Sequence, residues 1–261
     1  MIESKIIAHR GLSSLAPENT LAAISLAAKA GIQWVEIDAI ALSDGSIVMW
    51  HDNSVDRCSD GTGAMSTHTK ESIQTLDCGS WFSPQYAGEK MATIEQAIDH
   101  IQALGLGLNL EFKLYQNSAQ TVVAPVLNYL NEHWQDFDKL IISSFDQEAL
   151  AYCYETNPHL KLGKLYEAIP DNWLEQMQSI NAVSCHCYYK PLTQQQVSAL
   201  KEHDYAVYCY TANDPALVEE HWGWGIDAIF TDYPQRFNDK LNDATNRKLS
   251  ALTAQYTERK A

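Results

Sequence analysis

Short apolar stretches rich in β-branched and aromatic residues alternate with longer amphipathic stretches along most of the chain. The apolar stretches predict strands at Ile6–His9, Trp34–Leu42, Ile47–His51, Leu108–Lys113, Leu140–Phe145, Leu162–Tyr166, Ala182–Cys187, Ala206–Tyr210 and Ala228–Thr231. The amphipathic stretches predict helices at Leu21–Ala30, Thr93–Leu104, Gln120–His133, Gln147–Thr156, Asp171–Gln178, Gln194–His203 and Pro215–Gly223. Such an alternation of strands and helices indicates a mainly parallel sheet.

One pair of predicted strands is joined without a helix. Asp44-Gly45 lies between Trp34–Leu42 and Ile47–His51, and Asp-Gly between extended segments is a strong hairpin signal. Without one hairpin arm, eight strand–helix units remain, and about 30 residues per unit is typical of a TIM (β/α)8 barrel. The alternative is a doubly wound open sheet. That fold usually has G-x-G-x-x-G after its first strand, where this chain reads HRGLSSLAPENT.

We expect a single barrel domain over residues 1–261, with two irregular parts. Residues of about 53–92 lack periodicity, and a connection of this length is usually functional. The aromatic side chains of Trp81, Phe82 and Tyr86 suit either a small satellite core or contact with a substrate. The polar tail of about 239–261 predicts a solvated terminal helix without evident chemistry.

The balance of charge limits the classes of partner. The chain has 18 Lys and Arg residues against 33 Asp and Glu residues, a formal charge of −15. This excess repels phosphate backbones and anionic membrane surfaces, so we expect neither nucleic-acid binding nor stable membrane association. The apolar runs are shorter than the ~20 residues of a membrane span, and the first residues, MIESKIIAHR, do not resemble a signal peptide.

The six cysteines form no disulfide framework and suit a reducing, cytoplasmic location. Cys185-His186-Cys187 resembles a metal site, but in a strand the two thiols share one face and the imidazole points to the other. We therefore expect no zinc there.

Charged and imidazole side chains occur in four successive strand segments that are otherwise apolar. They are His9-Arg10, Glu36-x-Asp38, His51-Asp52 and Glu111-x-Lys113. Residues two apart in a strand point to the same face, and the carboxyl ends of barrel strands meet at one mouth. Counting outward from the Asp44-Gly45 turn places His51 opposite Asp38. These side chains are therefore expected to share one pocket.

This set of side chains suits phosphodiester cleavage. Three carboxylates repel one another unless a cation neutralises them, and a hard divalent ion, Mg²⁺ or Ca²⁺, prefers oxygen ligands. The two histidines can serve as general base and general acid. Arg10 and Lys113 supply fixed positive charge for phosphoryl oxygens.

The ordered motifs resemble those of the glycerophosphodiester phosphodiesterase family over roughly residues 5–237. They are H-R-G…P-E-N-T at His9–Thr20, V-E-I-D at Val35–Asp38, W-H-D at Trp50–Asp52 with Arg57 and Gly61-x-Gly63, and N-L-E-F-K at Asn109–Lys113. Later segments that resemble the family lie at Leu76–Phe82, Ser143–Phe145, Thr211–Asp214 and Phe230–Pro234. The resemblance is to the cytosolic bacterial branch.

The resemblance implies a distorted TIM barrel with a small inserted cap after the His-Asp motif. It implies a small-molecule substrate, a glycerophosphodiester that is hydrolysed to glycerol 3-phosphate and an alcohol. Residue by residue, it implies one divalent metal on Glu36, Asp38 and Glu111. His9 and His51 match the acid–base pair, and Arg10 and Lys113 match the phosphate contacts.

Two positions depart from the family pattern, and one more has two interpretations. Tyr210 occupies a position where Trp is common, which affects the lining of the substrate pocket, and Ala228 replaces a usual Gly. Asn19 could cap the first helix or take a role beside the ligand.

Two other functions are compatible with this pattern: a lysophospholipase D-like enzyme, and a non-catalytic barrel that binds a cation or phospho-ligand. The sequence leaves several points open. They are the preferred alcohol, the physiological metal, which histidine is base and which is acid, whether water or a neighbouring glycerol hydroxyl attacks first, and whether the chain forms a homo-oligomer.

Overall fold

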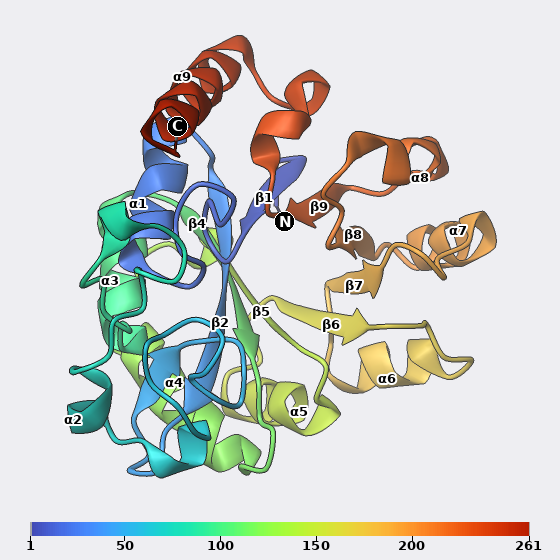
Figure 1. The fold of residues 1–261 in the computed structure, drawn as a ribbon. Coiled ribbons are helices and arrows are strands. Elements are labelled where there is room, and N and C mark those ends of the chain that lie inside the picture. Colours follow the sequence, from blue (N-terminus) through green and yellow to red (C-terminus); the bar gives the residue numbers. More distant parts are fainter. Residues whose placement is uncertain (1, 261) are drawn as a thin grey trace.

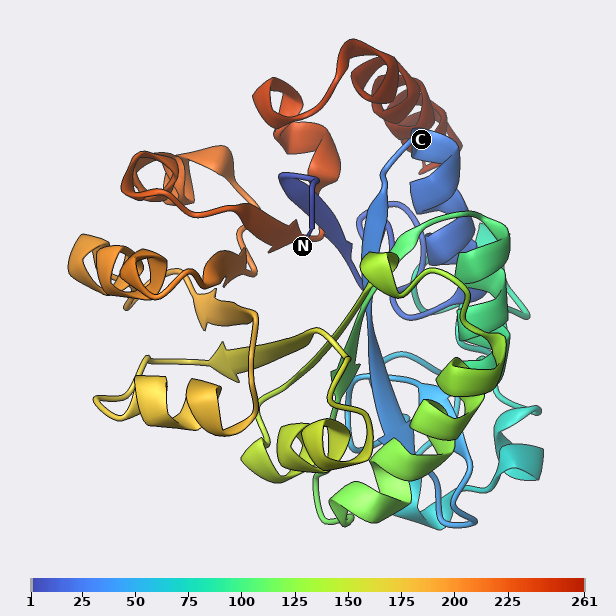
Figure 2. The ribbon, with the colours of Figure 1, turned by 180° about the vertical axis from the view of Figure 1, so that it is seen from behind.

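The computed structural model describes residues 2–260, and the predicted TIM barrel is confirmed. Strands β1 (Ile6–His9), β2 (Trp34–Ala41), β4 (Gly107–Phe112), β5 (Leu140–Ser144), β6 (Leu162–Tyr166), β7 (Ser184–Tyr188), β8 (Ala206–Tyr210) and β9 (Ala228–Thr231) are parallel. Pairing of β1 with both β9 and β2 closes the sheet. The barrel that results has its strands inside and its helices outside (Figures 1 and 2).

The connecting helices lie close to their predicted positions. They are α1 (Leu21–Ala30), α3 (Ile94–Ala103), α4 (Ala119–His133), α5 (Gln147–Thr156), α6 (Trp173–Ser179), α7 (Gln194–Glu202) and α8 (Glu219–Trp224). The short helix α2 (Lys70–Ile73), within the insertion, was not predicted, and α9 (Asp243–Lys260) forms the C-terminal tail. The predicted helix Pro215–Gly223 is instead a 3₁₀ turn at Pro215–Leu217 followed by α8. Within residues 2–260, no helix is both long and apolar enough to cross a membrane.

The short strand β3 (Ile47–Met49) is the distortion in the barrel. It runs antiparallel to the second half of β2, beyond the residues through which β2 pairs with β1. The predicted register of this hairpin is wrong by one residue, because Ala39 lies opposite Met49 and Trp50 donates its amide to Asp38 O. The loop has three residues rather than two, and its Gly45 adopts φ 81°, the left-handed conformation that closes such loops.

Apolar side chains form an outer and an inner core. The outer core packs the helices onto the sheet. The inner core fills the barrel and consists of Ile2, Ile7, Trp34, Ile141, Ala206, Tyr208, Ala228 and Phe230. Trp34 lies so close to the Gly107 backbone that a Cβ atom at Gly107 would meet the indole at 2.4 Å. The inner core thus fills the barrel toward the amino ends of the strands and leaves their carboxyl ends for polar side chains.

The insertion and the β2–β3 hairpin share a separate hydrophobic core. It contains Ile40, Leu42, Val48, Trp50, Val55, Cys58, Met65, Ile73, Leu76, Cys78 and Met91. Trp81 is 40% exposed and meets Phe82 edge to face at 5.6 Å between centroids. The three aromatic side chains of the insertion lie outside this buried core and pack in a small cluster of their own, in which Phe82 contacts Trp81, Tyr86 and Tyr256.

The C-terminal helix α9 is only partly solvated. It lies beside α1 (Figure 1), with Leu249 fully buried and the Thr245 hydroxyl donating to Gly31 O at 3.2 Å. Tyr256 also contacts the Phe82 ring at 5.8 Å. The tail therefore packs against both the barrel and the insertion, which corrects the prediction of a solvated helix.

Candidate active site

A cavity of about 270 Å³ opens at the carboxyl ends of the strands. Its lining comprises His9, Arg10, Glu36, His51, Asn109, Glu111, Lys113, Phe145, Leu165, Glu167, His186, Tyr210, Thr211 and Phe230. Each of the eight parallel strands contributes a lining residue from within the strand, apart from β5, whose contribution is Phe145, the residue after its end. The structure therefore brings both predicted histidines, both cations and two of the three carboxylates to one cavity.

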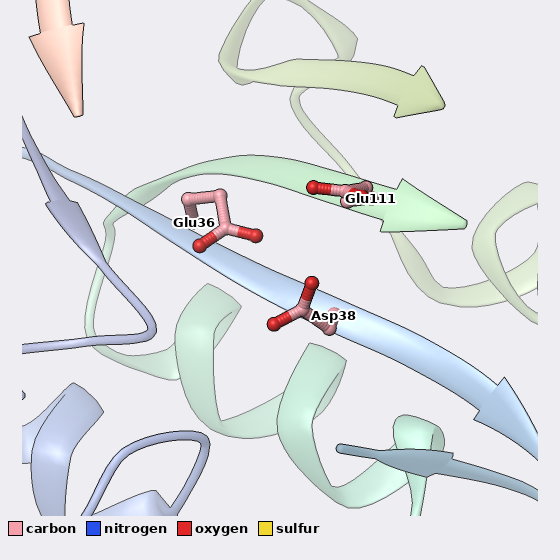
Figure 3. Close-up of side chains that lie close together, drawn as sticks. All are labelled: Glu36, Asp38 and Glu111. Atoms are coloured by element: carbon pink, nitrogen blue, oxygen red, sulfur yellow. The ribbon is translucent and has the colours of Figure 1, made fainter. Parts of the chain in front are cut away.

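The third carboxylate, Asp38, lies directly beside the other two. Glu36 and Asp38 point from the same face of β2, and Glu111 is the register partner of Asp38 on β4 (Figure 3). All three residues are buried, and one oxygen from each lies within 4.8 Å of the others. The buried Glu36 Oε1 atom has no hydrogen-bond partner among the described residues. This all-oxygen set with an unpartnered atom fits a hard divalent cation.

Burial and neighbouring charges shift the pKa of each of the three carboxylates. Burial, and then the charges of Asp38 and Glu111, raises the pKa of Glu36 well above its ordinary value. Burial also raises the pKa of Glu111 against the opposing charge of Lys113. Burial alone would raise the pKa of Asp38 too, but the cations Lys113 and Arg10 outweigh it and lower that pKa. A bound cation would favour ionisation of all three groups.

The turn after β1 orients Arg10 toward the carboxylates. Arg10 has φ 57° and Gly11 φ 79°, and a Cβ atom on Gly11 would lie 2.7 Å from that of Ala23, so this turn requires glycine. The Arg10 amide donates to Glu36 Oε2 at 3.0 Å, and its Nε atom lies 3.5 Å from Asp38 Oδ2.

Lys113 forms the second cationic contact. Its Nζ atom lies 2.5 Å from Glu111 Oε1 and 3.3 Å from Asp38 Oδ1. Both predicted cations therefore lie at the edge of the carboxylate cluster.

Two of the histidines that line the cavity, His9 and His51, each have a carboxylate on the Nδ1 atom. His9 Nδ1 lies 2.7 Å from Asp232 Oδ1, and His51 Nδ1 lies 2.6 Å from Asp52 Oδ1. A carboxylate at Nδ1 holds the Nδ1–H tautomer, which leaves Nε2 for a proton transfer. His9 Nε2 is 3.8 Å from Glu36 Oε2, so this nitrogen faces the carboxylate cluster. Burial lowers the pKa of His51, which favours a neutral ring.

The sequence analysis assigned no role to Asp232 or Asp52. Asp232 follows β9, and it also accepts hydrogen bonds from Ser13 Oγ at 3.1 Å and Asn213 Nδ2 at 2.7 Å. Its proximity to His9 depends on the closure of the barrel between β9 and β1. The local signals were an acidic residue directly after the final strand and its place in the Phe230–Pro234 segment that resembles the family.

A second network joins the insertion to the turn before α1. Arg57 donates to both oxygens of Glu18 at 2.8 Å and through Nε to Asp52 Oδ2 at 2.7 Å. Glu18 also accepts from Arg10 at 2.6 Å. Arg57 thus fixes the carboxylate that holds His51, a role the sequence analysis did not assign to it.

The prediction that Asn19 caps α1 is wrong, because Thr20 is the N-cap and accepts from Ala23 N. Asn19 is buried at φ 50°, donates Nδ2 to Asp38 Oδ2 at 2.8 Å and accepts from Asp38 N at 3.2 Å. The side chain therefore orients a carboxylate of the cluster and does not line the cavity.

The remaining pocket candidates behave differently. Tyr210 lines the cavity as predicted, and its hydroxyl donates to Tyr166 O at 2.9 Å. Among the described residues that line the cavity, neither Trp81 nor Phe82 occurs. Their predicted contact with the substrate pocket is not seen in this structure. The cavity does include Glu167 and His186, which the sequence analysis did not select.

A closed parallel barrel with ionisable side chains at its carboxyl mouth defines the architecture of a TIM-barrel enzyme. The family model described as "Glycerophosphoryl diester phosphodiesterase family" matches residues 9–236. The chain therefore belongs to this family of phosphoric diester hydrolases, which confirms the resemblance found in its motifs.

Individual relatives agree with this assignment. A glycerophosphodiester phosphodiesterase of Bacillus subtilis is 31% identical, with 89% of this chain and 84% of the relative covered. One from Caldanaerobacter subterraneus is 30% identical, with coverage of 90% and 96%. The solved structure of an Oleispira antarctica phosphodiesterase, in complex with the product sn-glycerol-3-phosphate, has a TM-score of 0.87 and 36% identity, with coverage of 90% and 96%.

Proposed function

We propose that this chain hydrolyses glycerophosphodiesters to glycerol 3-phosphate and an alcohol. The observation that carries this proposal is the conjunction, at one cavity, of a buried three-carboxylate cluster with two imidazoles that each have a carboxylate on Nδ1. The similarity to a phosphodiesterase whose structure contains sn-glycerol-3-phosphate supports the choice of product.

One divalent cation, Mg²⁺ or Ca²⁺, is proposed to bind to Glu36, Asp38 and Glu111. When bound, it would supply positive charge for the developing charge on the phosphoryl oxygens. The Asn19 amide would hold Asp38 in its ligand orientation.

Arg10 and Lys113 are proposed to hold the phosphoryl group beside this cluster. Arg10 already uses Nη1 on Glu18, so its remaining donors are those that can reach a phosphate. Lys113 contributes a point charge that the substrate would share with Glu111 and Asp38.

His9 and His51 are proposed as the acid–base pair. One Nε2 atom takes the proton from the attacking hydroxyl, and the other imidazole delivers a proton to the leaving alkoxide. Asp232 and Asp52 stabilise the imidazolium that forms in each case. We expect the glycerophosphate part to be recognised closely and the alcohol more loosely.

We further propose that the enzyme acts in the cytoplasm on small-molecule substrates. The six cysteines are buried and unpaired, which suits a reducing compartment.

Activity on defined diesters after chelation tests the proposal. Glycerophosphocholine and glycerophosphoethanolamine should be hydrolysed only after Mg²⁺, Ca²⁺ or Mn²⁺ is restored, and bis(p-nitrophenyl) phosphate, which lacks glycerol, much less efficiently. Asp38→Asn should fold, by circular dichroism, and lose metal-dependent activity. Equal efficiency on the glycerol-free diester would contradict glycerol recognition, and a preference for long-chain lysophospholipids would indicate a lysophospholipase D.

A further inference from the structure

The cavity has a polar floor and an aromatic mouth. At the floor, Asn109 and His186 are almost fully buried. Asn109 Oδ1 and His186 Nδ1 have no hydrogen-bond partner among the described residues. At the mouth, Phe145 is 39% exposed, Glu167 is exposed and Tyr210 is half-buried. The two ends therefore suit different parts of a substrate.

The aromatic side chains at the mouth are held in place before a substrate binds. Phe145 and Tyr210 meet edge to face, with 5.9 Å between their centroids. The buried Lys164 ammonium donates to Phe145 O at 2.5 Å. The Tyr210 hydroxyl donates to Tyr166 O. These bonds fix one ring through its backbone and the other through its hydroxyl, so the mouth keeps two aromatic surfaces in a defined arrangement.

The charge at this mouth favours a cation. Glu167 follows β6 and lines the same cavity. Burial, and then the nearby carboxylates Glu111 and Glu167 among other groups, raises the pKa of Tyr210 above its ordinary value. Lys113 Nζ lies 5.9 Å from the Phe145 ring, but its charge is already paired with Glu111 and Asp38. Among the described residues that line the cavity, Glu167 is thus the exposed carboxylate, and it shares this lining with the two rings.

We propose that Phe145, Tyr210 and Glu167 form the subsite for the leaving alcohol and favour alcohols that carry a positive charge, such as choline or ethanolamine. The inference rests on the proposed hydrolysis of glycerophosphodiesters and specifies its substrate class. Aromatic faces attract ammonium groups, and the attraction is stronger when a carboxylate lies nearby.

The floor is less suitable for such a group. A quaternary ammonium has no hydrogen to donate to Asn109 Oδ1 and would cover it without a hydrogen bond. Glycerol hydroxyls can both donate and accept, so they can satisfy the amide oxygen and the imidazole nitrogen. A diester with its glycerol at the floor and its cationic alcohol at the mouth satisfies both ends.

The experiment compares glycerophosphocholine with its neutral isostere, glycerophospho-3,3-dimethylbutanol, in which carbon replaces the charged nitrogen. The wild-type enzyme, with its metal restored, should give a kcat/KM about 5-fold or more higher for the choline ester. Glu167→Gln and Phe145→Leu should each reduce this ratio about 3-fold or more, chiefly through a higher KM for the choline ester. Glycerophosphoethanolamine should follow glycerophosphocholine.

The matched control is Glu175→Gln, which removes the same charge from an exposed position on α6 outside the cavity. Its choline-to-isostere ratio should equal that of the wild type. A ratio near one in the wild type, or a ratio unchanged in both cavity variants, would overturn the inference while hydrolysis of both esters upheld the proposed function. No hydrolysis of any glycerophosphodiester would overturn the proposed function and the inference together.

Discussion

Strands β1, β2 and β4 bring charged side chains to the mouth of the barrel, whereas β6, β7 and β8 each end in a tyrosine. On the first side, the carboxylate cluster, Arg10 and Lys113 contact one another directly. On the second side, Tyr188 and Tyr210 stack at 6.0 Å, and Phe145 packs edge to face on Tyr210. The groups proposed to react are thus concentrated on one side. Among the described residues that line the cavity, the opposite side contributes aromatic surfaces and one exposed carboxylate, Glu167.

The imidazoles show the same difference. His9 and His51 each have a carboxylate on Nδ1, which can stabilise the charged ring. Among the described residues, His186 has only the Ser184 hydroxyl as a hydrogen-bond partner, on Nε2 at 2.9 Å, and burial lowers its pKa to about 3. The two histidines proposed to exchange protons and a histidine whose burial favours the neutral ring therefore occupy the same cavity with opposite surroundings.

Removal of the two carboxylate-bound imidazoles should have the largest effect. His9→Ala and His51→Ala are each expected to lower kcat by about 10²–10⁴-fold, the usual contribution of a positioned acid or base. Steady-state rates on glycerophosphocholine measure this. His133→Ala, on the exposed surface of α4, is the control and should keep wild-type turnover. Near-wild-type kcat in either cavity variant would remove that histidine from the proposed mechanism.

The charged side of the mouth could be predicted from the sequence because ionisable residues in apolar strands are conspicuous. Glu36, Asp38 and Glu111 needed only strand periodicity and the convergence of parallel strands. Strand periodicity alone did not identify the aromatic side, because Phe145 and Tyr210 at apolar strands look like ordinary core residues. Tyr210 was predicted only through the family resemblance, and the closed barrel is needed to show that Phe145 lines the cavity beside it.

Contacts between residues far apart in the chain could not be predicted from the sequence either. The bond between His9 and Asp232 spans 223 residues and depends on β9 pairing with β1. The position of His51 was predicted from the wrong hairpin register, because the Gly45 conformation adds one residue to the loop. His51 nevertheless lines the cavity, at the point where the chain leaves β2 after the bond between Trp50 N and Asp38 O.

Loss of the carboxylate behind His9 should have the next largest effect. Asp232→Asn replaces an acceptor with an amide that no longer stabilises the imidazolium or selects the Nδ1–H tautomer. We expect kcat to fall by about 10- to 10³-fold, which is less than in His9→Ala, with the dependence of kcat on pH altered. Asp138→Asn, at a 92%-exposed side chain, is the control. An unchanged kcat and pH profile would show that His9 does not depend on Asp232.

Removal of the Asn19 amide should weaken the binding of metal by the carboxylate cluster on the charged side. Asn19→Ala removes the amide that orients Asp38 Oδ2, and loss of such an orienting contact typically costs about 10- to 100-fold in metal affinity. Isothermal titration calorimetry of the metal-depleted protein with Mg²⁺ or Ca²⁺ measures the change in affinity. The control is Thr20→Ala at the N-cap of α1, which should cost ~1 kcal/mol of stability without a change in metal affinity. Equal metal affinities in Asn19→Ala and wild type would leave Asn19 with a structural role only.

The smallest expected effect concerns the neutral imidazole on the aromatic side. Because burial lowers the pKa of His186 to about 3 from 6.5, the unfolded chain takes up a proton in this interval that the folded chain does not. Folding stability from this residue is therefore complete above pH 6.5 and is lost as pH falls toward 3, at up to ~1.4 kcal/mol per pH unit. Urea unfolding of wild type and His186→Gln at pH 7 and pH 5 isolates this contribution from that of the carboxylates. The wild type should lose more stability than the variant over this interval. Equal losses in the two proteins would mean that His186 is protonated in the fold, and the contrast between the two sides of the mouth would then not extend to their imidazoles.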